Sequence, residues 1–479
     1  MTATTFFWHD YETFGADPQR DRPCQFAGIR TDTDFNVVGK PTMLYCRPAD
    51  DYLPHPEACL ITGITPQLAM AQGVCEAEFA KTVFDALAEP GTCGVGYNSI
   101  RFDDEVTRNL LYRNFFDPYA REWQNGNSRW DLIDVVRAAR ALRPEGIVWP
   151  DKEDGLPSFR LEDLTQANGL LHAAAHDALS DVYATIAIAK LVKQKQPKLF
   201  EYLFNQRHKS QVLKLLQLGS FTPLVHISGR LPSRNHCLAL VLPLAPHPAN
   251  ANEVIVYDLA NDPQALLELS AEEIRQRLFV ATDALPAGVE RIPLKTVHIN
   301  KCPVLAPISV LKPADLERLQ LDLTVHYRHL QQIQAAPALD TKLAEVFSRR
   351  YDDTPPSDPD LMIYSGGFFS QNDKALCYRL RQTDADSLAD FESKFEDWRL
   401  PEMLFRYRAR NYPGTLSEAE AQQWSAFCRG RLATETTGFT DLAQFRAKIS
   451  ALKTSHGQDN PILAALTAYA DQLAAKHHV

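Results

Sequence analysis

The stretch from Thr4 to Gly15 constrains the fold more than any other, because two acids follow a short apolar run. Residues 4–8 read Thr-Thr-Phe-Phe-Trp, the pattern of a buried strand, and Asp10 and Glu12 come directly after them. Side chains alternate across a strand, so these two acids point to the same side. Neighbouring carboxylates repel each other unless a cation lies between them, and hard divalent cations prefer oxygen ligands. The pair predicts a metal site at the end of a core strand, with two solvated acids beyond the strand as the alternative.

The composition is that of a globular protein with more than one domain. A chain of 479 residues exceeds one ordinary core, and its 45% hydrophobic and 23% charged residues are ordinary values. No stretch offers the roughly 18 apolar residues that a membrane helix needs, and no basic segment followed by an apolar one marks the N-terminus for export. Nine cysteines without a Cys-x-x-Cys pair argue against a disulfide framework and a zinc site. We expect a cytoplasmic protein that does not bind a membrane.

The formal net charge of −10 disfavours nucleic-acid binding, but the charges are unevenly distributed. Residues 202–252 contain no Asp or Glu and carry Arg207, Lys209, Lys214, Arg230 and Arg234. This acid-free segment predicts a local basic surface on an acidic protein, with a chance gap in the acids as the alternative.

Patterning along the chain predicts three domains. The first two hundred residues alternate short apolar strands with helical segments, which indicates an α/β layer with a mixed sheet. The expected strands are 4–8, 25–31, 42–46 and 93–97, and the expected helices are 76–88, 104–114, 130–141, 161–168 and 176–194. A β-rich segment with a helical insertion at 264–278 follows, and the last part is almost wholly helical. We therefore expect domains at 1–196, 197–348 and 354–479.

Two later places carry further candidates for chemistry. Asp103 follows the expected strand 93–97 at the start of a helix, where an acid is also a common helix cap. His176 and Asp181 open another expected helix, where a histidine is often only a cap or a surface residue. The neighbouring acids Asp104 and Asp177 compete for the same roles.

Taken together, Asp-x-Glu, a later Asp and a His-x4-Asp motif resemble the DEDDh exonuclease superfamily. The segments 9–15, 21–23, 25–27, 60–66, 101–108, 127–132, 142–147, 298–306 and 407–416 are similar to one bacterial family within it, and the likeness spans nearly the whole chain. The resemblance implies a ribonuclease-H-like exonuclease domain, a Src-homology-3-like β-barrel domain and an α-helical C-terminal domain, which together close a channel over a single strand.

The resemblance also implies the activity and the site. It implies a 3′→5′ exodeoxyribonuclease of DNA repair and recombination that degrades single-stranded DNA to 5′-mononucleotides. Asp10, Glu12, Asp103 and Asp181 are expected to ligate two Mg²⁺ ions, with Mn²⁺ as a plausible substitute, and His176 is the expected general base. The chemistry agrees, since two metals can activate a water and stabilise the leaving oxygen, and an ordinary histidine accepts a proton near neutral pH.

Substrate and partner contacts are expected elsewhere. Glu12, at the metal site, is also expected to contact the substrate, and Phe14, Phe102 and Tyr202 are candidates for base stacking. In this family Arg143 and Tyr202 belong to a surface that receives the acidic, Phe-ending tail of single-stranded-DNA-binding protein, and the protein is expected to be a monomer. An RNA-directed or proofreading exonuclease, and a non-catalytic nucleic-acid clamp, are the alternative functions.

Overall fold

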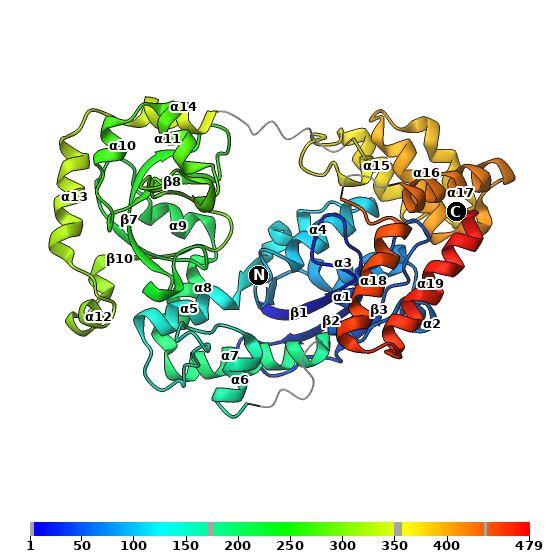
Figure 1. Cartoon of the computed structure of the whole chain (residues 1–479), viewed down its shortest axis with the longest axis horizontal. Helices are drawn as coiled ribbons and strands as arrows, with labels where there is room; N and C mark the ends of the chain where they lie inside the picture. Colours follow the sequence, from blue (N-terminus) through cyan, green and yellow to red (C-terminus); the bar gives the residue numbers. More distant parts are fainter. Residues whose placement is uncertain (1–3, 171–176, 349–356, 435–437) are drawn as a thin grey trace. The chain divides into compact units, whose positions relative to one another are not determined.

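The computed structural model describes residues 4–170, 177–348, 357–434 and 438–479, and Figure 1 labels most of its helices and several of its strands. The chain forms two compact units. The first consists of residues 1–128, 172–186 and 354–479, and the second of residues 129–171 and 187–353. Within the described residues, no helix is both long and apolar enough to cross a membrane.

The first unit is built on a mixed five-stranded sheet with the order β3-β2-β1-β4-β5. The strand β1 pairs antiparallel with β2 and parallel with β4, and β2 pairs antiparallel with β3. The strands are β1 (Thr5–Thr13), β2 (Pro23–Thr31), β3 (Thr42–Tyr45), β4 (Thr92–Gly96) and β5 (Ser128–Asp131). The chain passes from the first unit to the second within β5. The predicted mixed sheet is confirmed.

The strand β1 runs through the two acids, which corrects the expectation that it ends at Trp8. Its antiparallel register with β2 continues to Glu12, which lies opposite Gln25, whereas its parallel register with β4 stops where Trp8 meets Val95. Asp10 and Glu12 therefore lie within a strand, past the point where the neighbouring strand β4 leaves it.

Helices from both ends of the chain complete the first unit. They are α1 (Pro56–Thr62), α2 (Pro66–Gln72), α3 (Glu76–Ala88), α4 (Asp103–Arg113), α15 (Gln371–Leu380), α16 (Arg399–Asn411), α17 (Glu418–Ala433), α18 (Leu442–His456) and α19 (Pro461–His477). Figure 1 shows α18 and α19 beside α1. One buried cluster joins Phe14 and Tyr52 to Leu463 and Tyr469, so the N- and C-terminal parts share a core.

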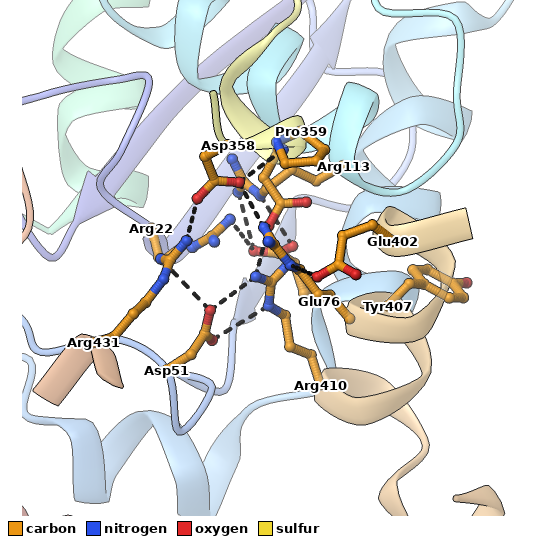
Figure 2. Close-up of polar contacts among 12 residues, drawn as sticks. Arg22, Asp51, Glu76, Arg113, Asp358, Pro359, Glu402, Tyr407, Arg410 and Arg431 are labelled. Atoms are coloured by element: carbon orange, nitrogen blue, oxygen red, sulfur yellow. Dashed lines mark hydrogen bonds and ion pairs between the residues drawn. The ribbon is translucent and has the colours of Figure 1, made fainter. Parts of the chain in front are cut away.

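A buried network of ion pairs also joins the two ends of the chain. Figure 2 shows Arg410 and Arg431 pointing toward Asp51, with Asp358 close by. Arg410 donates to Asp51 at 2.8 Å and to Asp360 at 2.7 Å, and Arg431 lies 3.7 Å from Asp51. These side chains are nearly inaccessible, so each charge depends on its partners.

The second unit contains an all-antiparallel five-stranded sheet with the order β10-β6-β7-β8-β9. Its strands are β6 (Leu224–Ile227), β7 (Leu238–Pro246), β8 (Glu253–Asp258), β9 (Leu294–His298) and β10 (Val304–Pro307). Helices of this unit are α5 (Leu132–Leu142), α6 (Leu161–Ala167), α8 (Pro197–Gln206), α9 (Lys209–Leu215), α10 (Gln264–Glu268), α11 (Ala271–Leu278), α12 (Pro313–Arg318), α13 (Leu323–Ala335) and α14 (Asp340–Ser348). The expected helical insertion is present as α10 and α11, separated by the capping box that Ser270 forms with Glu273.

Three further differences from the expected elements have local causes. The segment expected as one helix at 130–141 begins as strand β5, and the helix α5 starts after Asp131, whose side chain accepts from the Ile133 N–H as an N-cap. The short helices α1 and α2 were not expected at all. Both begin with a proline in the first turn, and α1 stops at Gly63, whose left-handed φ of 72° is the usual helix C-cap geometry.

Candidate active site

Three of the predicted carboxylates converge at the end of β1. Donor oxygens of Asp10, Glu12 and Asp181 lie within 4.8 Å of one another. Asp10 and Glu12 are two residues apart on one face of β1, and Asp181 lies in the first turn of α7 (Ala178–Lys195). The backbone N–H of Asp181 donates to the Asp177 carbonyl at 3.0 Å, as in a regular helical turn.

Asp103, the fourth predicted carboxylate, faces the same place from α4. It is the first residue of that helix, whose N-cap is Phe102. One oxygen of Asp103 accepts a hydrogen bond from the backbone N–H of Tyr11 at 3.2 Å. Because Tyr11 lies between Asp10 and Glu12 in the sequence, the Asp103 carboxylate lies against β1 next to both acids. Its negative charge acts on both Asp10 and Glu12.

The crowding of these acids changes their pKa values. Burial, followed by the charges of Asp103 and Glu12, raises the pKa of Asp10 well above its ordinary value. Burial and the charge of Asp181 raise the pKa of Glu12 to about 8. The protein alone therefore holds the site in an electrostatically unfavourable state, which a cation between the oxygens would relieve.

The donor set fits a hard divalent cation. Every predicted ligand is a carboxylate, which suits Mg²⁺ or Mn²⁺, whereas zinc favours histidine and cysteine. The acids Asp10, Glu12, Asp103 and Asp181 would hold such ions, and four carboxylates balance the charge of two divalent cations.

The competing neighbours of these acids have other partners. Asp104 pairs with Arg121 at 2.6 Å, and both side chains are inaccessible. Asp177 accepts a hydrogen bond from the Ser180 N–H at 3.1 Å, the geometry of a helix cap, although its charge also acts on Asp10 and Glu12. His176 lies outside the described residues, directly before Asp177 in the sequence.

His9 and Tyr11 lie on the opposite face of β1, as strand alternation predicts. Both are buried, and their rings pack against Phe26. Burial and the nearby charge of Arg121 lower the pKa of His9 to about 4, so this histidine is neutral at physiological pH. Neither side chain reaches toward the acids.

One predicted stacking residue is wrong. Phe14 is only 1% exposed, because its ring packs into the core beside Tyr52, and no base can stack on it there. Phe102 is half-buried against the core of the first unit. In the second unit, Tyr202 is 36% exposed and its hydroxyl donates to the Leu305 carbonyl.

Arg143, predicted to receive an acidic tail, is held by its own unit. Its guanidinium donates to the Val310 carbonyl at 3.0 Å and lies 3.5 Å from Asp315. The side chain remains half-buried rather than inaccessible.

A groove in the first unit carries aromatic residues that the sequence analysis did not select. Its volume is about 510 Å³, and it runs between the end of α4 and α15. Trp123, Phe368 and Tyr378 line it and are 66%, 86% and 57% exposed, and the cations Lys374 and Arg381 lie at the same groove. The Gly-Gly-Phe-Phe run at 366–369 could have marked it, since two aromatic residues there directly follow two glycines.

Comparison with known proteins decides the family. A family model described as exonuclease matches residues 7–189, one described as the exonuclease I SH3-like domain matches residues 207–349, and one described as the exonuclease I C-terminal domain matches residues 357–473. Exodeoxyribonuclease I of Escherichia coli K12 is 51% identical over 421 residues, which cover 88% of each chain. The chain belongs to the exonuclease I family.

Other members of the exonuclease I family are similar to this chain over nearly its whole length. Exodeoxyribonuclease I of Haemophilus influenzae is 46% identical over 463 residues, 96% of each chain. The solved structure of exonuclease I from Methylocaldum szegediense superposes with a TM-score of 0.94 at 52% identity, and that of E. coli exonuclease I with a dA16 oligonucleotide with a TM-score of 0.94 at 48% identity. Each covers 98% of this chain and is itself covered completely.

Membership of the exonuclease I family confirms the predicted superfamily, fold class and class of enzyme. The mixed sheet belongs to the exonuclease domain, and the antiparallel sheet at 224–307 lies within the SH3-like domain. The protein is an exonuclease, which hydrolyses phosphodiester bonds. Enzymes of this family need a divalent metal, and the cluster of Asp10, Glu12 and Asp181 could hold one. A zinc-bound form of the E. coli enzyme with single-stranded DNA has also been solved.

Proposed function

We propose that the protein removes 5′-mononucleotides from the 3′ end of single-stranded DNA with the help of two Mg²⁺ ions, as a DNA repair and recombination enzyme. The convergence of Asp10, Glu12 and Asp181 within 4.8 Å, with Asp103 beside them, carries this proposal. Mn²⁺ is a plausible substitute for Mg²⁺, because it also accepts an all-carboxylate ligand set.

Different residues of the chain have different roles in the proposed hydrolysis. Asp10, Glu12, Asp103 and Asp181 would hold the ions, which when bound would supply positive charge to the attacked phosphate and to the leaving 3′-oxygen. His176 takes the proton of the attacking water, as an imidazole with an ordinary pKa near 6.5 can. The backbone of Tyr11 fixes the orientation of Asp103 through its hydrogen bond. Glu12 also contacts the terminal nucleotide.

Two surfaces are suited to hold the single strand. The acid-free segment 202–252 supplies cations for the phosphates, and Lys209 and Lys214 are exposed. The aromatic groove of the first unit, lined by Trp123 and Phe368, supplies faces on which bases stack regardless of sequence. Phe102 and Tyr202 remain proposed stacking residues.

The proposed partner is the acidic, Phe-ending tail of single-stranded-DNA-binding protein. Arg143 and Tyr202 are both partly accessible in the second unit, and Arg143 already pairs with the carboxylate of Asp315, which a carboxylate of the tail would replace. We also propose that the protein is a cytoplasmic monomer with domains at 1–196, 197–348 and 354–479. All nine cysteines are free thiols, which supports a reducing compartment.

A comparison of DNA and RNA strands of equal length and sequence tests this function. We expect the protein with Mg²⁺ to degrade the DNA strand and to release nucleoside 5′-monophosphates, with the RNA strand largely intact. Faster loss of the RNA strand would favour the RNA-directed alternative, and release of nucleoside 3′-monophosphates would contradict the proposed bond cleavage.

A further inference from the structure

The first turn of α4 begins with two consecutive acids that face different surroundings. Successive helical residues point about 100° apart, so Asp103 and Asp104 cannot both face the carboxylate cluster. Asp103 accepts from Tyr11 N–H and acts electrostatically on Asp10. Asp104 instead pairs with Arg121 at 2.6 Å.

The ion pair of Asp104 and Arg121 is completely internal. Their side chains are 2% and 1% exposed, and the charge of Arg121 also acts on His9 and Tyr11. Since those two residues lie on the face of β1 opposite Asp10, the cation lies on the reverse side of the strand from the metal site. A charge buried this deeply has no solvent to replace a lost partner.

The segment that carries Arg121 is itself attached to α4. Arg121 belongs to a 3-10 turn, η1 (Ala120–Glu122), and the next residue, Glu122, forms two hydrogen bonds with Arg108 of α4 at 2.7 and 2.9 Å. Two neighbouring charges of η1 therefore hold two positions of α4, one helical turn apart. The neighbouring stripe of α4, about 100° around the helix from Arg108, is fixed to β1, because the Tyr11 hydroxyl bonds to the Thr107 hydroxyl at 2.9 Å.

We propose that Arg121 is a positioning residue for metal binding. By holding Asp104 on the reverse side of β1, it sets the rotation of the first turn of α4 so that Asp103, and not its neighbour, faces Asp10. Without the cation, the buried carboxylate of Asp104 loses its 2.6 Å ion pair, and the first turn of α4 loses a contact that fixes its rotation. The inference rests on the proposed role of Asp103 as a ligand.

Binding of Mn²⁺ to the DNA-free protein, measured by electron paramagnetic resonance of the free ion, tests this role apart from activity. We expect Arg121→Met to weaken Mn²⁺ binding by about tenfold or more, as loss of a residue that orients a ligand typically does. The double variant Asp104→Asn with Arg121→Met should recover most of the affinity, because the neutral amide carries no buried charge that depends on Arg121. The variant Arg121→Lys keeps a cation and should bind Mn²⁺ almost as the parent does.

Arg30→Met is the matched control. Arg30 is a partly buried arginine of the same sheet, but it donates to Thr5 and Thr92 at the far end of β1 and β4 from the acids. We expect this variant to unfold at a lower temperature with unchanged Mn²⁺ affinity. Equal Mn²⁺ affinity in Arg121→Met and Arg30→Met would overturn the proposal, as would a folded Arg121→Lys that binds as weakly as Arg121→Met. If the parent binds no Mn²⁺, the proposed metal site fails rather than the role of Arg121.

Discussion

The surroundings of Glu12 make the stability of the metal-free protein depend on pH. Its side chain is buried beside Asp181 and Asp103, and its pKa of about 8 lies above the ordinary value of a glutamate. A carboxyl group with a raised pKa in the folded state binds a proton that the unfolded chain releases. The metal-free protein is therefore most stable when this group is protonated.

We expect the metal-free protein to lose stability as the pH rises from about 4.5 to about 8. The contribution of one such group is at most roughly 1.4 kcal/mol in the free energy of unfolding per pH unit. Chemical denaturation in EDTA at several pH values measures it, and Glu12→Gln should flatten the dependence. A metal-free protein that becomes more stable over this range would contradict the electrostatic description of the site.

For single residues, the position of some site side chains can be predicted from the sequence and that of others cannot. Strand alternation alone places Asp10 and Glu12 on one face and His9 on the other. Nothing local separates Asp103 from Asp104, because the difference lies in the distant partner Arg121. The burial of Phe14 has no local signal either, since the cluster around it combines Tyr52 with residues from the far end of the chain.

At the scale of elements, buried ion pairs attach helices α16 and α17 to the loop that carries Asp51. Burial alone would raise the pKa of Asp51, but the charges of Arg410 and Arg431 hold it below the ordinary value. The stabilisation from these pairs is therefore present above about pH 4 and is lost as the pH falls below it. Figure 2 shows how the two guanidinium groups approach the carboxylate.

We expect Asp51→Asn to lower the free energy of unfolding by about 3–5 kcal/mol, because it leaves buried cations without their partner. Urea denaturation at neutral pH measures the loss. The control Arg446→Met removes an exposed pair with Asp471, whose side chains are 50% and 61% exposed, and should cost less than about 1 kcal/mol. Equal losses in the two variants would show that the buried network does not stabilise the docking of these helices.

The elements that the sequence predicts well are those with long, regular patterns. The helix expected at 76–88 is α3 with the same bounds, and the last part of the chain is helical, as expected. The extension of β1 past Trp8 could not be read from local pattern, since it depends on pairing with β2, which places Gln25 opposite Glu12. The short helices α1 and α2 have too few residues to show a helical period.

At the scale of the whole molecule, the net charge of −10 must be reconciled with a polyanionic substrate. The acid-free segment offers a solution, because its exposed lysines can approach phosphates while the acids lie elsewhere in the sequence. The acid-free segment can be read directly from the sequence. The core shared by the N- and C-terminal parts of the first unit cannot, because it depends on contacts between residues that are distant in the sequence.

We expect the double variant Lys209→Gln with Lys214→Gln to bind single-stranded DNA more weakly and with less salt dependence. If both lysines contact phosphates, the slope of log affinity against log salt should fall in magnitude by about 1.4. Fluorescence anisotropy in EDTA, which prevents cleavage, measures it. The control Lys81→Gln with Lys448→Gln makes the same charge change outside the segment and should keep the parental slope; an equal fall in both would mean that net charge alone sets binding.

The most direct test of metal-dependent 3′→5′ hydrolysis at the four carboxylates is a time course of digestion of a 5′-labelled single strand. With Mg²⁺ the labelled strand should shorten stepwise, and EDTA should stop the shortening. The variant Asp181→Asn should leave the strand intact while still binding it in EDTA. Persistence of the full-length strand with Mg²⁺ present, or cleavage by Asp181→Asn at the parental rate, would contradict the assignment of the site.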